Sequence, residues 1–227
     1  MLYTEEMARA NIRNREGKRV FFLGKGDTLT PSARDWLNRE RISILPASQA
    51  KIQEFQLENG AILQEKPEDY THLRGNILVP KTHPVIAFRG KMDSLQAQLL
   101  LTQTLCPMEG LEEILALARN IIRWDVLEEP ARMDHLLGLS PQQLRWHSHD
   151  PQTFYGIPHF MPESRDGEAI LRLNLCRCAA REAELAAAHA FGRSRMDLLQ
   201  ALNRISSAIY LLMILEKGER HGTTRPN

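Results

Sequence analysis

The chain has 227 residues, of which 43% are hydrophobic and 25% are charged, and its 29 Lys and Arg nearly balance its 28 Asp and Glu. This length suits one domain or one and a half, and the composition is typical of a chain that folds around its own core. The near-neutral charge excludes a general attraction to nucleic acid or to an anionic membrane surface. An anionic ligand must therefore be met by a local cluster of cations.

The chain carries no apolar segment that would direct it to a membrane. Its first residues lack the apolar stretch of a signal peptide, and no later run reaches the roughly 18 apolar residues that a spanning helix needs. We therefore expect a cytoplasmic protein. The three cysteines, Cys106, Cys176 and Cys178, are too few and too badly spaced for a disulfide framework or a four-ligand zinc site. Reduced thiols and no bound metal are expected.

The first 50 residues have a mixed pattern. Residues 19–23 and 42–45 are predicted strands, and 31–40 is a predicted helix with Thr30 as its N-cap and Pro in its first position. Glycines and prolines then break the pattern up to about residue 82. We predict a small α/β appendage over 1–50 and a linker over 51–82.

From residue 83 onward the pattern is helical, with apolar residues at three- and four-residue spacing. The predicted helices lie near 90–105, 110–128, 140–147, 165–191 and 195–217. The expected fold is mainly α, with a helical-bundle domain of about five helices over residues 83–220. Between Arg145 and Arg165 lies an irregular stretch rich in His, Pro and aromatic residues, and loops of this length are usually functional.

One predicted helix carries a charged face that suits a polyphosphate. Arg177, Arg181 and Glu184 are spaced at i, i+4 and i+7, so they share one side of the helix. Guanidinium groups donate planar pairs of hydrogen bonds to phosphate oxygens and stay charged at any working pH. The alternative is a solvated ladder of salt bridges.

Polar residues also interrupt the last helix, where Asn203, Arg204 and Ser206 lie in an otherwise apolar run. Buried polar groups must be hydrogen-bonded or must face a ligand, so these residues either bind a substrate or join helices. Asp93 falls in the first turn of its predicted helix, where a carboxylate also suits the helix dipole without any further function.

Three blocks of sequence resemble a known family, the ATP:corrinoid adenosyltransferases. Residues 90–95 (GKMDSL) are similar to the G-T-x-D-E-L start of that family's first bundle helix. Residues 177–184 (RCAAREAE) have the spacing of its R-x-x-x-R-x-A-E helix, and residues 202–206 (LNRIS) are similar to its L-N-R-L-S. The blocks occur in the family's order along the chain.

The resemblance is closer to the branch of this family that serves ethanolamine utilisation, through residues 29–33, 88–94, 135–140 and 199–214. Members of that branch often have a His and Cys metal cluster with paired cysteines, whereas residues 56–82 here contain no cysteine. The resemblance therefore implies a metal-independent member. Ser207 also stands where the wider family usually has Asp, which leaves that carboxylate's role without a residue here.

The resemblance implies which residues handle ATP. The expected fold is a bundle in which ATP and the corrinoid meet in a cleft between the subunits of a homotrimer. Arg177 and Arg181 would hold the triphosphate, Glu184 would orient them or reach the nucleotide, and Asn203 would bind ATP. Asp93 would pair with Arg177 across the interface. Cob(I)alamin would attack C5′ of ATP, which is expected to bring Mg²⁺.

The irregular stretch is expected to contact the corrinoid. In the resembling family an aromatic residue three positions before a Pro displaces the lower ligand of Co(II), and this spacing falls on His159, with Phe160 beside it. The sequence leaves the choice between them open. Phe154, Tyr155 and Met161 complete the apolar set.

The resemblance also implies partners: a reductase or flavin as electron donor, a B12-dependent lyase or dehydratase as recipient, and a possible association with a bacterial microcompartment. The alternative is a non-catalytic helical scaffold or docking module of such a compartment. Two local motifs have alternative interpretations as well. His147 and His149 could hold a metal or make ordinary hydrogen bonds, and residues 24–27 (GKGD) form a turn rather than a phosphate loop.

Overall fold

The structure is a computed structural model that describes residues 1–15, 18–49, 55–63 and 65–220. The chain divides into two compact units. The first comprises Met1–Phe55 and Ile62–Glu65, and the second comprises Gln56–Ala61 and Lys66–Asn227. Each unit is described by itself.

The first unit is a small α/β structure. Its elements are β1 (Leu2–Tyr3), α1 (Glu5–Ala10), β2 (Arg13–Arg15), β3 (Lys18–Leu23), β4 (Thr28–Leu29), α2 (Pro31–Arg39), β5 (Ser43–Pro46), a 3₁₀ turn (Ala47–Gln49) and β7 (Ile62–Leu63). Strand β3 pairs antiparallel with β2 and parallel with β5. The two predicted strands and the predicted helix are confirmed, and the side chain of Thr30 accepts a hydrogen bond from the Ala33 amide, as an N-cap does.

The turn after β3 is structural. The Asp27 amide donates to the Gly24 carbonyl at 3.1 Å, and the Asp27 carboxylate binds the N-terminal ammonium of Met1 at 2.6 Å. A Cβ atom on Gly24 would lie 2.4 Å from the Asp27 carboxylate, so a larger residue there would displace the Asp27 side chain. The interpretation of residues 24–27 as a turn is confirmed.

The segment that precedes the helices contains strands where the sequence predicts a linker. Strand β9 (Ile77–Pro80) pairs parallel with β6 (Phe55–Leu57) and antiparallel with β8 (Tyr70–Arg74). Leu73 and Val79 are buried together with Val85 of the first bundle helix. These strands are only three to five residues long. The glycines and prolines between them interrupt the alternation of apolar and polar residues by which a strand is recognised.

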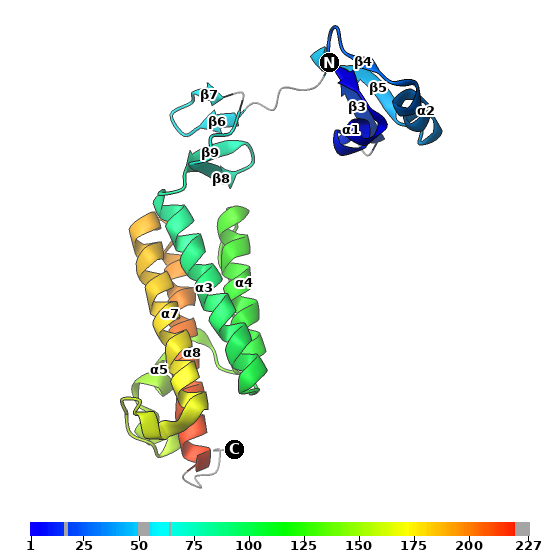
Figure 1. Cartoon of the computed structure of the whole chain (residues 1–227). Coiled ribbons are helices and arrows are strands. Elements are labelled where there is room, and N and C mark those ends of the chain that lie inside the picture. Colours follow the sequence, from blue (N-terminus) through cyan, green and yellow to red (C-terminus); the bar gives the residue numbers. More distant parts are fainter. Residues whose placement is uncertain (16–17, 50–54, 64, 221–227) are drawn as a thin grey trace. The chain divides into compact units, whose positions relative to one another are not determined.

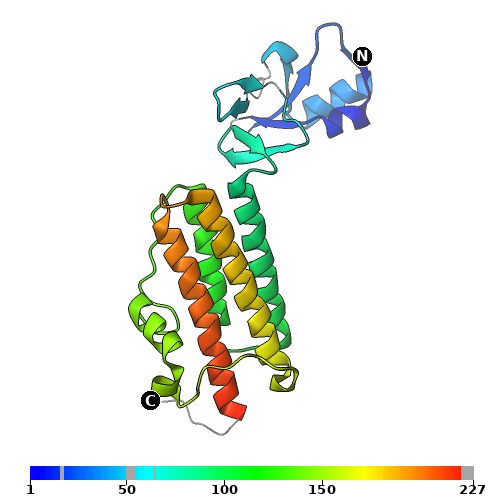
Figure 2. The same cartoon turned by 90° about the vertical axis from the view of Figure 1, so that its left-hand side faces the viewer.

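Four long helices run side by side in the second unit (Figure 1; Figure 2). They are α3 (Pro84–Leu105), α4 (Leu111–Val126), α7 (Gly167–Phe191) and α8 (Met196–Arg220). Helix α3 packs on α4 and α7, and α8 packs on α4 and α7. Two short helices, α5 (Pro141–His149) and α6 (Pro151–Tyr155), lie against α8, and a 3₁₀ turn (Ser164–Asp166) precedes α7. Of the described residues 58% are helical, which confirms the mainly α fold.

Helix α3 begins six residues before the predicted start at Gly90, because Pro84 occupies its first position and the His83 side chain caps the Val85 amide. Buried residues recur along it at three- and four-residue steps from Val85 through Phe88 to Thr102, and this periodicity outweighs the cost of one interior glycine. Asp93 therefore lies past the second turn of the helix. Its interpretation as a first-turn capping aid is wrong.

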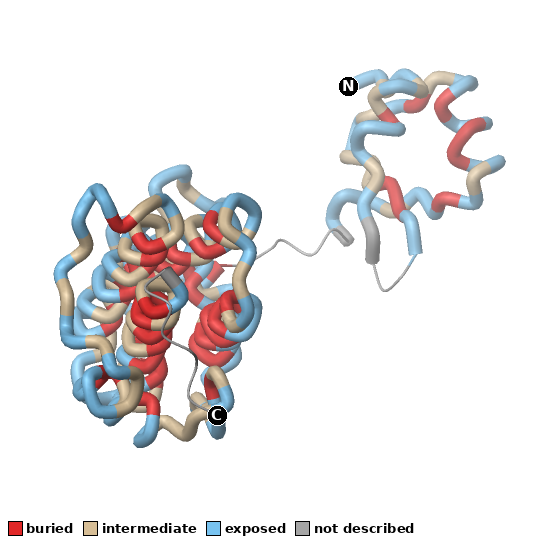
Figure 3. The backbone as a smooth tube through the Cα atoms, turned by 90° about the horizontal axis from the view of Figure 1, so that it is seen from below, coloured by how far each residue is buried: buried red, intermediate tan, exposed pale blue. Residues whose placement is uncertain are grey.

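The core of the bundle is made by the facing sides of these helices, where the buried residues gather (Figure 3). Helix α8 is long and apolar enough to cross a membrane, with a mean hydropathy of 1.5 over its best window, although the sequence reading found no such run. However, 67% of that window is buried inside the bundle. Such burial is typical of the core helix of a water-soluble bundle.

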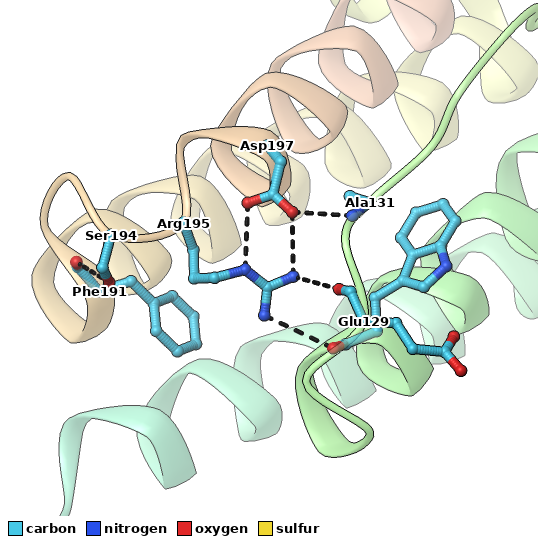
Figure 4. Close-up of polar contacts among 7 residues, drawn as sticks. Glu129, Ala131, Phe191, Ser194, Arg195 and Asp197 are labelled. Carbon is cyan, nitrogen blue, oxygen red and sulfur yellow. Dashed lines mark hydrogen bonds and ion pairs between the residues drawn. The ribbon is translucent and has the colours of Figure 1, made fainter.

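A polar network fastens the turn between α7 and α8 to the segment after α4 (Figure 4). The Arg195 guanidinium donates two hydrogen bonds of 3.1 Å to the Asp197 carboxylate and one of 2.8 Å to the Glu129 carbonyl. Asp197 also accepts the Ala131 amide at 2.7 Å. The network fixes the angle at which α8 leaves the turn, and so the place of every residue that α8 presents.

We expect Arg195→Met to lower the stability of the fold without removing a residue of the active site. The variant removes the hydrogen bonds that Arg195 donates to the Glu129 carbonyl and to the Asp197 carboxylate, which keeps the Ala131 amide as a donor. A lost hydrogen bond costs about 1 kcal/mol, and more when a charged group takes part. Thermal unfolding followed by circular dichroism should show a fall in Tm of several degrees. An unchanged Tm would mean that the network adds nothing to the fold.

Candidate active site

A cleft of about 430 Å³ lies in the bundle where α5, α7 and α8 meet the loop between α6 and α7. Its lining combines guanidinium groups, hydroxyl groups, imidazoles and apolar side chains. These residues are Ser148, His149, His159, Phe160, Met161, Pro162, Arg177, Arg181, Asn203, Ser206, Ser207, Tyr210 and Met213. Among these lining residues there is no Asp or Glu.

Helix α7 contributes two arginines from one face, as the sequence predicts. The Nε and Nη2 atoms of half-buried Arg177 donate to the Asn174 side-chain oxygen at 3.3 and 3.1 Å. Arg181 is exposed and makes no hydrogen bond or ion pair within the described part of the chain. Neither guanidinium pairs with Glu184 there, so the salt-bridge ladder does not form among the described residues. The pair is available to an anion.

Glu184 instead faces the polar segment of α8. Its carboxylate accepts a hydrogen bond of 3.1 Å from the side-chain amide of Asn203, and the Asn203 oxygen accepts one of 2.7 Å from Arg204. Arg204 is only 6% exposed, and its Nε atom has no hydrogen-bond partner among the described residues. Burial lowers the pKa of Arg204, nearby Arg145 lowers it further, and Glu184 opposes the shift. Arg204 thus fixes the orientation of the Asn203 amide.

The loop contributes the apolar side of the cleft. Phe160 is half-buried, whereas the neighbouring Met161 is 82% exposed. Both ring nitrogens of His159 are bonded, one to the Tyr210 hydroxyl at 2.9 Å and the other to the His149 carbonyl at 3.0 Å. The cleft therefore has a cationic side from α7 and an apolar side from this loop.

Four of the predicted site residues do not line the cleft: Glu184, which bonds Asn203 from outside it, Asp93, Phe154 and Tyr155. Asp93 is exposed on α3, and within the described chain it forms no bond with Arg177. Phe154 stacks on His147 with ring centroids 3.9 Å apart, and the Tyr155 hydroxyl bonds the His147 Nδ1 atom at 2.8 Å. Burial lowers the pKa of His147 and raises that of Tyr155. This aromatic group stabilises the fold of the loop beside the cleft.

The cleft also contains residues that the sequence reading did not assign to the site, above all Tyr210, Ser207 and Met213. The sequence contains a signal for Tyr210. Tyr210 lies seven residues after Asn203 and four after Ser206, so all three share one face of α8. His149 reaches the cleft because α5 packs against α8, and the sequence pattern does not specify this packing.

The imidazoles of His147 and His159 are hydrogen-bonded within the protein. In the described ranges, up to residue 220, no group of three or more His, Cys, Asp or Glu is arranged to hold a metal ion. Chemically, the site offers fixed positive charge beside an apolar wall, and its lining residues provide no carboxylate as a general base. Such a site suits a reaction in which an anionic leaving group develops and the nucleophile comes with the substrate.

The sequence profile of the cobalamin adenosyltransferase family matches residues 62–216, which include the whole cleft. The chain belongs to the cobalamin adenosyltransferase family. It is therefore a transferase, and the resemblance seen in the sequence blocks is confirmed. A non-catalytic scaffold is not favoured.

Two proteins that are similar to this chain are each named corrinoid adenosyltransferase EutT. The protein from Salmonella typhimurium (strain LT2) is 32% identical, and that from Escherichia coli (strain K12) is 34% identical. Both alignments cover 93% of this chain and 91% of the relative. The similarity thus extends through the first unit as well as the bundle, in agreement with the ethanolamine-utilisation branch.

Proposed function

We propose that the cleft of α7 and α8 is where the 5′-deoxyadenosyl group of ATP is transferred to Co(I) of cobalamin. The observation that carries this proposal is the Arg177 and Arg181 pair, which has no ion-pair partner in the described chain and lines a cleft without carboxylates. The apolar loop on the other side suits the face of a corrin ring. Residues 83–220 would carry the reaction, with 1–50 as an appendage that does not take part in it.

In this reaction the Co(I) lone pair attacks C5′ of ATP, a cobalt–carbon bond forms, the C5′–O bond breaks, and triphosphate leaves with the electron pair. The nucleophile belongs to the corrinoid, so the chain's own residues bind, orient and hold charge. Arg177 and Arg181 hold the triphosphate as its charge increases, Asn203 binds ATP, and Glu184 sets the orientation of Asn203. The product is adenosylcobalamin.

Asp93 has a separate role in the proposal. Asp93 is exposed on α3 and lies outside the cleft of its own chain, and we propose that it pairs with Arg177 of a second copy in a homotrimer. Mg²⁺ is proposed to arrive with ATP, since the lining residues of the cleft offer hydroxyl groups but no carboxylate that would hold the ion. Its chemistry there would be to neutralise phosphate charge.

The relatives support a pathway for the product. We propose that this chain, like proteins of the ethanolamine-utilisation branch, works in the bacterial cytoplasm and supplies adenosylcobalamin to a B12-dependent lyase or dehydratase. A reductase or a reduced flavin would deliver the electron to Co(II). An association with a bacterial microcompartment is part of the same proposal.

The activity is tested by an anaerobic assay with purified chain, MgATP and chemically reduced Co(I) cobalamin. We expect a light-sensitive product with the absorbance spectrum of adenosylcobalamin and an equal amount of released triphosphate. The same mixture without protein is the control. Absence of product under strictly anaerobic conditions would contradict the proposed reaction and favour a scaffold that keeps only the bundle.

Metal independence is a further expectation, because residues 56–82 contain no cysteine. Chelator-treated protein, returned to a buffer that contains Mg²⁺, should adenosylate at its original rate. Elemental analysis of the same sample would check that other metals are gone. A large loss of rate that zinc or iron restores would reveal a site built from His72, His83, His147 or His149.

A further inference from the structure

The loop that faces the cleft is bound to α8 through the hydroxyl group of Tyr210. The Tyr210 hydroxyl lies 2.9 Å from the Nδ1 atom of His159 and accepts the Phe160 amide at 3.3 Å. The Tyr210 ring also lies parallel to the His159 ring, with 5.6 Å between centroids and an interplanar angle of 10°. Tyr210 thus contacts both residues that compete for the corrin face.

The chemistry of the partners fixes the direction of each hydrogen bond. The His149 carbonyl, 3.0 Å from the His159 Nε2 atom, can only accept, so Nε2 carries the proton. In the neutral imidazole Nδ1 is then an acceptor, and the Tyr210 hydroxyl donates to it while accepting from the Phe160 amide. Neither ring nitrogen of His159 remains to bind cobalt or any other metal.

A second contact from α8 holds the other side of Phe160. Lys217, two turns beyond Tyr210, places its ammonium 5.0 Å from the centroid of the Phe160 ring and forms an ion pair with Asp166. Asp166 is 5% exposed and also accepts the Glu163 amide at 2.7 Å. The loop is therefore bound to one face of α8 at two points, by Tyr210 at residues 159–160 and by Lys217 at Asp166.

We propose that Tyr210 is a positioning residue for corrinoid binding: it holds His159 and the Phe160 backbone so that the Phe160 ring, and not the His159 imidazole, forms the wall beneath the corrin. This inference rests on the proposed function of the cleft. It assigns His159 to the fold of the loop. It also makes the removal of the lower cobalt ligand depend on a hydroxyl group that touches no substrate.

The test is Tyr210→Phe, which removes the hydroxyl and keeps the ring, with Tyr70→Phe in strand β8 as the matched control. Full-length protein is mixed with MgATP and Co(II) cobalamin, and the fraction of four-coordinate Co(II) is measured from its spectrum. We expect Tyr210→Phe to reduce this fraction by about tenfold, since two hydrogen bonds are lost. Tyr70→Phe should keep the four-coordinate fraction of the unmodified chain, and both variants should keep its helical circular dichroism signal.

A double-variant comparison guards against a merely structural effect. If Tyr210 acts through His159, then His159→Ala should lower the four-coordinate fraction as Tyr210→Phe does, and the double variant should be no worse than either single one. Additive losses would overturn the inference. So would a normal four-coordinate fraction in Tyr210→Phe when Phe160→Ala abolishes it. A normal four-coordinate fraction in Phe160→Ala would also overturn the inference, because another residue of the loop would then form the wall. Failure of the unmodified chain to adenosylate Co(I) cobalamin would instead contradict the proposed function.

Discussion

Arg177→Ala and Arg181→Ala are each expected to slow adenosylation of Co(I) cobalamin by about 10²–10³-fold. Both guanidinium groups line the cleft and are not neutralised by a carboxylate in the described chain, so each is available to the leaving triphosphate. Arg177→Lys should also be slow, because a single ammonium cannot replace a bidentate donor. Initial rates with saturating MgATP, followed by absorbance under anaerobic conditions, provide the measurement.

The matched control for this experiment is Arg172→Ala. Arg172 is on the same helix but does not line the cleft, and its Nη2 atom pairs with Glu168 at 2.6 Å. This variant should keep the rate of the unmodified chain and the same helical circular dichroism signal. Rates near normal in both cleft variants would show that the two arginines form only a solvated surface face.

Phe160→Ala is expected to have its largest effect when the cobalt enters as Co(II). Without the apolar wall the lower ligand stays on the metal and the ion remains hard to reduce. For a one-electron couple each 59 mV costs tenfold, so a shift of about 120 mV costs about 10²-fold with a weak reductant such as a reduced flavin. Turnover that starts from Co(II) cobalamin and reduced flavin provides the measurement.

The same Phe160→Ala protein serves as its own control. When a strong chemical reductant supplies Co(I), the rate should be close to normal, because the wall is no longer needed. Equal losses in both assays would mean that Phe160 binds the corrinoid in general. A normal rate from Co(II) would transfer the role to another residue of the loop, and Met161, which is 82% exposed at the cleft, would be the next to test.

Much of the bundle and part of the site could be predicted from the sequence, because local patterns determine them. The spacing of Arg177 and Arg181 specifies a shared helix face wherever the helix packs. Ser140 and Pro141 likewise marked the start of α5, where a capping box forms with Gln143. These features depend on neighbours a few residues away.

Other features depend on tertiary contacts that no local pattern contains. The predicted start of α3 near residue 90 is too late, because packing of Val85 and Phe88 extends the helix before it. Tyr210 lies in a mostly apolar stretch of the sequence, and its role is evident only from its hydrogen bond to His159 of the loop. The sequence predicts that Phe154 and Tyr155 contact the corrinoid. In the structure both side chains contact His147 instead.

The most direct test of the account is an experimental structure of the chain with MgATP and Co(II) cobalamin bound, prepared under anaerobic conditions. The account predicts the triphosphate against Arg177 and Arg181, the adenosine beside Asn203, and the lower face of the corrin on Phe160 with no ligand below the cobalt. Asp93 of a second copy should lie near Arg177. A nucleotide or corrinoid bound outside this cleft, or a lower cobalt ligand supplied by His159, would contradict the central claim.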